Sequence, residues 1–187
     1  MPITGNGWEL LITRQSEQQR IITLKSGKKR RYVRTVGVYK IYHDGQIVRG
    51  LSGMMAEARG PGDNSKPGNG RRIEAAAYPL LTSDGPRYMT HGFNSKPVSY
   101  PRPGLELRDT GNRSAILIHP GHGFLASIGC INPCSSLPNG KENIDLAGSH
   151  ARVAAIIDDL KAYLGKSFPK TNGKRIPGAS VVIDGEP

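Results

Sequence analysis

The sequence has little of what several classes of protein require. Its 187 residues include only two cysteines, too few for the disulfide framework of a small secreted domain. Aromatic residues make up 6%, which leaves few platforms on which single-stranded nucleic acid could stack. RRM, KH and C₂H₂ signatures are absent, so nucleic acid is not an expected partner. No apolar run approaches the ~20 residues of a membrane span, so we do not expect the chain to cross a membrane.

A secretory leader is also missing from the sequence. Residues 1–7 lack the apolar segment and the small-residue cleavage site of a signal peptide. We expect synthesis in the cytoplasm. If the target lies in the periplasm or the cell wall, we expect delivery by a route other than general secretion.

Acidic residues are few beside the basic ones. The chain has 15 Asp and Glu against 26 Lys and Arg, which gives a formal charge of +11 and favours an anionic partner. Part of this excess lies in a basic segment, residues 25–34. This segment either binds the anionic partner or is a solvated loop between strands. The segment contains Lys25, Lys28, Lys29, Arg30, Arg31 and Arg34.

Glycine and proline are plentiful, with 24 and 14 residues, which argues against a helical bundle and favours a turn-rich, mainly β protein. Asp44-Gly45 predicts a hairpin turn, and residues 60–70 predict a loop. Apolar and β-branched patterns predict the strands. These cover residues 8–13, 19–24, 31–42, 47–51, 72–81, 87–92, 105–108, 115–119 and 179–183.

One helix is predicted over residues 149–164. Its apolar residues recur at a period near 3.6, Ser149 is a suitable N-cap, and Gly165 ends the pattern. We therefore expect a single domain over residues 1–187, with a core of about residues 8–183. It should be a β-sheet or sandwich with one C-terminal helix packed on it.

The clearest chemical pattern lies in residues 116–133. A predicted buried strand ends at His119, a glycine-rich loop follows, and Gly129-Cys130 comes eleven positions later. A loop of this length can return beside its starting strand and place the imidazole next to the thiol. A neighbouring imidazole lowers a thiol's pKa and takes its proton, so we expect a thiolate well below the free-thiol pKa of about 8.5. The pattern predicts acyl transfer through a thioester.

The same residues carry a family resemblance. Ile118-His119-Pro120-Gly121, followed by Ser127-Ile128-Gly129-Cys130-Ile131, resembles the catalytic signature of the L,D-transpeptidase superfamily. The short spacing is more similar to two branches: a bacterial and phage family of uncharacterised L,D-transpeptidase-like domains, and the L,D-transpeptidase effectors of type VI secretion systems. For the first branch the likeness covers most of residues 8–183, including 35–39, 72–78 and 113–119.

The resemblance implies a function. Cys130 would be the nucleophile and His119 the base of an L,D-transpeptidase or L,D-carboxypeptidase that needs no metal or cofactor. Its substrate would be the peptidoglycan tetrapeptide stem, cleaved between meso-diaminopimelate and the terminal D-alanine, with water or an amine as acceptor. The effector branch also implies a secretion-system carrier and an immunity protein as partners.

The resemblance also implies the residues around the reacting pair. Gly129 and the Cys130 N–H match the oxyanion region, and near-site positions are Ser127, Ile131, Asn132 and His122. The sequence departs from the superfamily at two positions, because Ile128 replaces a histidine and Asn132 stands where arginine is common. The residues expected to bind substrate in its place are Arg113, Arg72 and Tyr78.

Two other hypotheses compete with the enzyme. His119, His122, Cys130 and Cys134 have side chains of the right type to hold a zinc ion. Alternatively, the chain is a non-catalytic basic module that binds nucleic acid or an anionic envelope polymer, in which case Cys130 is an inert buried thiol. Cys134 is interpreted as structural or as a partner that protects Cys130.

Overall fold

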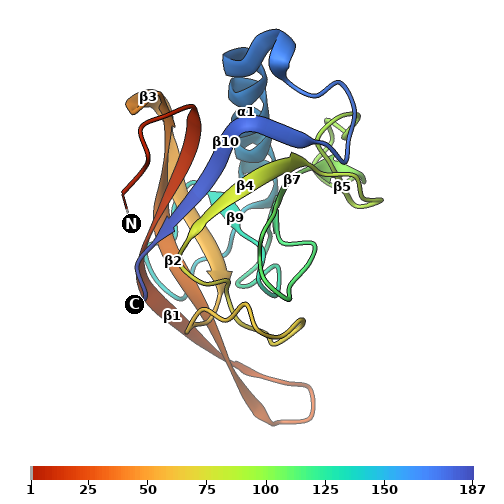
Figure 1. The fold of residues 1–187 in the computed structure, drawn as a ribbon. Coiled ribbons are helices and arrows are strands. Elements are labelled where there is room, and N and C mark those ends of the chain that lie inside the picture. Colours follow the sequence, from red (N-terminus) through yellow and green to blue (C-terminus); the bar gives the residue numbers. More distant parts are fainter. Residues whose placement is uncertain (1) are drawn as a thin grey trace.

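The computed structural model describes residues 2–187 and confirms a mainly β protein with one C-terminal helix (Figure 1). Within these residues, eight strands form one sheet in the order β8-β7-β4-β10-β1-β2-β3-β9. They are β1 (Trp8–Thr23), β2 (Lys29–His43), β3 (Gln46–Ala58), β4 (Ala77–Thr82), β7 (Leu105–Leu107), β8 (Leu117–Ile118), β9 (Asn132–Cys134) and β10 (Arg175–Asp184). A separate pair contains β5 (Tyr88–Met89) and β6 (Arg102–Pro103).

The two edges of the large sheet nearly meet. β8 lies at one edge and β9 at the other, yet Ile118 forms a parallel bridge with Ile131, the residue before β9. Of the two expected architectures, a β-sheet or a sandwich, the chain thus adopts the sheet, and this sheet is nearly closed. A closed sheet leaves few unpaired strand edges, and here it brings residues at positions 117–119 beside 130–132.

The predicted strands differ from the observed ones mainly in length. The segments 8–13 and 19–24 belong to one strand, β1, whose pairing with β2 is irregular between Arg14 and Ser16. Conversely, the predictions over 72–81, 87–92 and 115–119 were too long, since only β4, β5 and β8 are paired there. Strand propensity overestimates the length of a strand where the backbone groups of the adjoining residues bond to loops and not to a neighbouring strand.

The basic segment spans the end of a long hairpin. β1 and β2 pair as far as Thr23 and Lys29, and their outer half projects from the sheet (Figure 1). The solvated-loop interpretation fits Lys25 and Lys28, but not Arg34, which is fully buried and donates to Gln18 Oε1 and Phe124 O. Burial lowers the pKa of Arg34 to about 10. Arg34 is therefore part of the interior and not of the exposed charge.

α1 (Leu146–Leu164) packs into the core, where Val153 and Ile157 share a cluster with Trp8 of β1. The predicted N-cap was wrong, because the cap is Asp145, whose carboxylate accepts from Gly148 N at 2.6 Å. The predicted end at Gly165 is confirmed. In residues 2–187 no helix combines the length and apolar character needed to cross a membrane.

Ser149 has a different role from the predicted one. Its side chain is buried, donates to Pro133 O and accepts from Gly121 N at 2.9 Å. These bonds tie the first turn of α1 both to β9 and to the loop that follows His119. The helix thereby holds the two chain segments that contain the candidate site.

Asp145→Ala tests the observed cap. Losing an N-cap carboxylate should lower the free energy of unfolding by about 1 kcal/mol, measured by urea denaturation. Asp158→Ala is the matched control, because it removes an exposed carboxylate from the middle of the same helix and should change stability by less than ~0.5 kcal/mol. Equal losses in both variants would contradict the assignment of the cap.

Candidate active site

Two backbone hydrogen bonds place the predicted catalytic residues side by side. Ile131 N donates to Leu117 O at 2.8 Å, and His119 N donates to Ile131 O at 3.0 Å. This parallel register sets Leu117 opposite Cys130 and His119 opposite Asn132. Alternate residues share a face of a strand, so Cys130 and His119 are diagonal neighbours, a relation that typically spans ~7–8 Å.

The Cys130 sulfur lies at the open end of this ladder. It accepts from Leu117 N at 3.4 Å and lies 3.6 Å from Ala115 O. The side chain is half-buried, and within residues 2–187 the thiol has no hydrogen bond to His119. Burial raises the pKa of the thiol, while the Leu117 N–H and the charge of Arg113 oppose that rise. The resting sulfur is therefore a neutral thiol.

The imidazole of His119 is buried, with 3% of the residue exposed. Its Nδ1 lies 2.8 Å from Pro120 O, a contact that needs the proton on Nδ1 and leaves Nε2 as the acceptor. The ring stacks on Tyr88 with centroids 4.1 Å apart. Burial, together with the smaller effect of the Arg102 charge, lowers the pKa of His119 to about 4, although the hydrogen bond to Pro120 O acts in the opposite direction. His119 is thus a neutral base near neutral pH.

These protonation states correct one expectation from the sequence. A thiolate–imidazolium pair would need a lowered pKa at Cys130 and a raised one at His119, and the structure shifts each in the opposite direction. Burial disfavours both charges, and the two side chains are not bonded to each other in a way that would compensate. A reaction at this pair would therefore have to transfer the proton during the attack itself.

Asn132 and Ser127 connect the two halves of the site. Asn132 is fully buried, and its Nδ2 donates to His119 O at 3.0 Å. Ser127 Oγ lies 3.0 Å from Asn132 Oδ1 and 3.1 Å from Cys130 O, so its proton serves these two acceptors. Asn132 therefore holds the loop and offers no free group to a substrate. Ile131, another near-site prediction, is a core residue.

Arg113 supports the loop from its buried side. The residue is 6% exposed, and its guanidinium donates to Arg71 O at 2.9 Å and to Ile128 O at 3.3 Å. Gly129 lies against it with φ 104°, a conformation that favours glycine. In residues 2–187 the N–H groups of Gly129 and Cys130 donate no hydrogen bond, and Gly129 itself is buried.

The structure does not bring the other predicted residues to the sulfur. Arg72 is 1% exposed and forms an ion pair with Glu186 at 2.7 Å. Tyr78 is a core residue whose hydroxyl donates to Glu74 O at 2.7 Å. Their predicted substrate contacts were wrong, because both side chains already have internal partners. His122 is exposed in the loop after His119.

Cys134 lies in a separate apolar cluster with Val36, Leu137 and Ile144. Burial raises its pKa to about 11, and both cysteines are free thiols. Within residues 2–187, no three His, Cys, Asp or Glu side chains come close enough to hold a metal ion. The four side chains of the zinc hypothesis are therefore not gathered into a site.

Sequence reasoning missed a pocket near Cys130, which we call the thiol pocket, although Cys130 itself is not one of its lining residues. It has a volume of about 310 Å³ and includes Ala115 and Leu117, the two residues that contact Cys130 Sγ. Tyr88 was missed with it, since it belongs to a two-residue strand without a motif. The remaining lining residues are Ser83, Asp84, Gly85, Pro86, Arg87 and Glu106.

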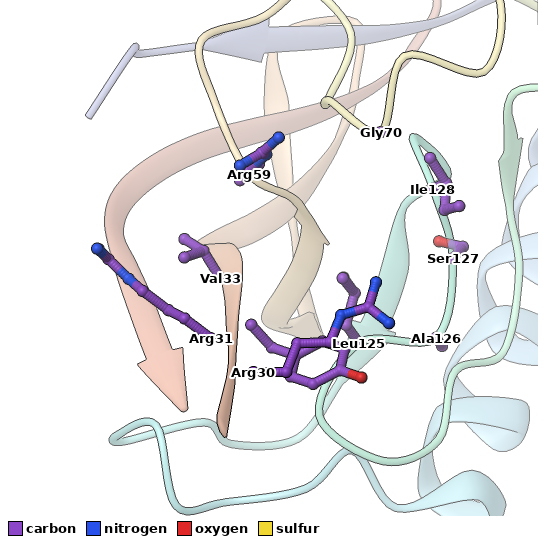
Figure 2. Close-up of a pocket in the computed structure, with 10 residues that line it drawn as sticks. Arg30, Arg31, Val33, Arg59, Gly70, Leu125, Ala126, Ser127 and Ile128 are labelled. Carbon is purple, nitrogen blue, oxygen red and sulfur yellow. The ribbon is translucent and has the colours of Figure 1, made fainter. Parts of the chain in front are cut away.

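A second hollow, the basic groove, has a volume of about 460 Å³ and borders the loop that leads to Cys130 (Figure 2). Figure 2 shows Arg59 and Val33 on one side and Ser127 and Ile128 on the other. The rest of its lining is Arg30, Arg31, Tyr32, Gly70, Leu125 and Ala126. The basic groove therefore contains residues of the loop before Cys130, whereas the lining of the thiol pocket contains none of residues 119–130.

Comparison of the chain with protein-family models, with curated proteins and with solved structures finds no match. The function is therefore inferred from the residues of the site, their burial and their hydrogen bonds.

The neutral resting pair predicts the pH dependence of alkylation. In a Cys134→Ala background, the rate of Cys130 modification by iodoacetamide should stay low at pH 6–7. It should rise with pH to a midpoint above that of free cysteine, because the thiol pKa is raised. Mass spectrometry of the alkylated fraction measures the rate. A midpoint below pH 7 would show that the ion pair forms after all.

Gly129→Ala tests the contact beneath the loop. A Cβ there would overlap the Arg113 guanidinium and hold a strained φ, so we expect a stability loss of at least ~2 kcal/mol and a displaced Cys130. Gly123→Ala is the control: its φ is also positive, at 71°, but a Cβ meets no atom within 4 Å. It should cost about 1 kcal/mol and keep the alkylation rate of Cys130.

Proposed function

We propose that the chain is a cysteine enzyme of the L,D-transpeptidase type, which cleaves or exchanges the terminal D-alanine of peptidoglycan tetrapeptide stems. The observation that supports this most is the diagonal placement of Cys130 and His119, with His119 Nδ1 bonded to Pro120 O and Nε2 left as a base. The resemblance of residues 118–131 to the superfamily signature supplies the substrate class.

The geometry suggests how the first half of the reaction proceeds. Cys130 Sγ turns away from Leu117 N and attacks the carbonyl of the diaminopimelate L-centre, while His119 Nε2 takes the thiol proton. The N–H groups of Gly129 and Cys130 stabilise the oxyanion that forms. The C–N bond then breaks, D-alanine leaves with the proton from His119, and the stem remains bound as a thioester.

In the second half, His119 takes a proton from the acceptor. Water or an amine attacks the thioester carbonyl, the C–S bond breaks, and the proton returns to the Cys130 sulfur. Hydrolysis gives a tripeptide stem, and an amine acceptor gives a cross-link or an exchanged D-amino acid. The same two residues perform both halves, so the accessible acceptor decides between the two activities.

The thiol pocket fits the D-centre of meso-diaminopimelate, which carries an ammonium group and a carboxylate. Glu106 and Asp84 supply acceptors for the ammonium, and Arg87 supplies a cation for the carboxylate. Ala115 and Leu117 connect this pocket to the sulfur. The resemblance to delivered effectors extends the proposal to the cell wall as the place of action, and to a carrier and an immunity protein as partners.

A non-catalytic basic binding module is the second candidate. The +11 charge and the basic groove favour it. Under this alternative Cys130→Ala would bind an anionic envelope polymer as the wild type does, binding would weaken steeply with salt, and no stem would be processed.

Substitution of the reacting pair tests the enzyme. Cys130→Ala should fold normally and abolish release of D-alanine from purified tetrapeptide muropeptides, measured by mass spectrometry. His119→Ala should lower turnover by roughly 10²–10⁴-fold, the usual effect of losing a general base.

The controls are the other members of each residue type. Cys134→Ala and His122→Ala should keep most of the activity, because Cys134 belongs to a separate cluster and His122 is exposed. Wild-type turnover by Cys130→Ala, or a critical His122 with a dispensable His119, would show that the residues are misassigned.

A further inference from the structure

The basic groove contains three cations without an ionic partner. Arg30, Arg31 and Arg59 line it, and within residues 2–187 none of them forms an ion pair. The guanidinium carbon of Arg30 lies over the Tyr32 ring, 5.0 Å from the ring centroid. Asp and Glu are absent from the ten lining residues. Because like charges repel, three such arginines around one hollow favour an anionic ligand.

The aliphatic part of the groove lining indicates the kind of anion. Val33, Leu125, Ala126 and Ile128 give it an aliphatic surface, and Ile128 is 63% exposed. Tyr32 is the only aromatic residue in the lining, so stacked nucleobases have little support. An aliphatic surface together with arginines suits a peptide that carries a carboxylate beside small aliphatic side chains.

The groove also lies beside the nucleophile. Ser127 and Ile128 line it, Ser127 Oγ bonds to Cys130 O, and only Gly129 separates Ile128 from Cys130. The thiol pocket, in contrast, is lined by Ala115 and Leu117, whose backbone atoms contact Cys130 Sγ. A substrate in the groove is therefore next to the reacting loop, through a different set of residues.

We propose that the basic groove binds the part of the stem that precedes diaminopimelate, and that it selects stems whose γ-linked D-glutamate has a free α-carboxylate. This inference rests on the proposed function. The stem has an alanine methyl next to that carboxylate. This pair of groups matches the aliphatic side chains and the arginines of the groove lining. Arg113 and Arg72, the residues first expected to hold a stem carboxylate, are bonded internally.

The first test measures binding without turnover. The Cys130→Ala protein is titrated calorimetrically with synthetic tetrapeptide stems that carry either D-glutamate or its α-amide, D-isoglutamine. Amidation removes the charge and keeps the shape, so the amidated stem should bind roughly tenfold more weakly. Equal affinity for the two stems would overturn the inference.

The second test locates the preference. Arg59→Gln and Arg31→Gln should each weaken binding of the free-acid stem about two- to fivefold, the range for partly exposed charge pairs, and leave the amidated stem unchanged. Arg59→Lys should retain part of the preference, because it keeps the charge and loses the forked donor. Arg49→Gln is the matched control, an exposed arginine near the other end of β3 that is not in the lining.

The outcomes separate this inference from the proposed function. If the wild type releases D-alanine from both stems with equal kcat/KM, the enzyme stands and the groove is misassigned. If it processes neither stem and Cys130→Ala binds neither, the proposed function falls, and the selection proposed for the groove falls with it. A preference that survives Arg59→Gln combined with Arg31→Gln would place the carboxylate elsewhere.

Discussion

The backbone bonds that join Leu117 and His119 to Ile131 are the constraint on which the rest of the site depends. They bring the edge strand β8 to the chain that enters β9, and so nearly close the sheet. The same register makes Cys130 and His119 diagonal neighbours. Because main-chain bonds set this placement, it does not depend on a direct bond between the thiol and the imidazole.

Burial is the main cause of the chemistry that this placement allows. His119 lies against Tyr88 and Pro120 O; the contact with Pro120 O fixes one tautomer, and burial lowers the pKa of the imidazole to about 4. The partly enclosed thiol has a raised pKa for the same reason. Both groups are therefore uncharged near neutral pH, because burial disfavours the charged form of each.

Two sets of arginines in this chain have different consequences. Arg34, Arg72 and Arg113 are buried, and each is bonded to carbonyl, carboxylate or side-chain oxygens that hold neighbouring segments together. The second set, Arg30, Arg31 and Arg59, has no ionic partner in the part of the chain described. These arginines line the basic groove beside the loop that leads to Cys130. Net charge alone does not distinguish the two groups, since each arginine counts equally in it.

Local patterns in the sequence were enough for the mainly β class, the hairpin at Asp44-Gly45 and the helix end at Gly165. They also nominate His119 and Cys130, whose roles stay a prediction. Those features depend on turn chemistry, capping and the period of apolar residues, which act over a few neighbouring positions. Tertiary structure decided the rest. The closure of the sheet, the stacking of Tyr88, the internal partners of Arg72 and Tyr78, and the protonation of the reacting pair all need segments far apart in the chain. Burial and long-range pairing cannot be read from residues that meet only after folding.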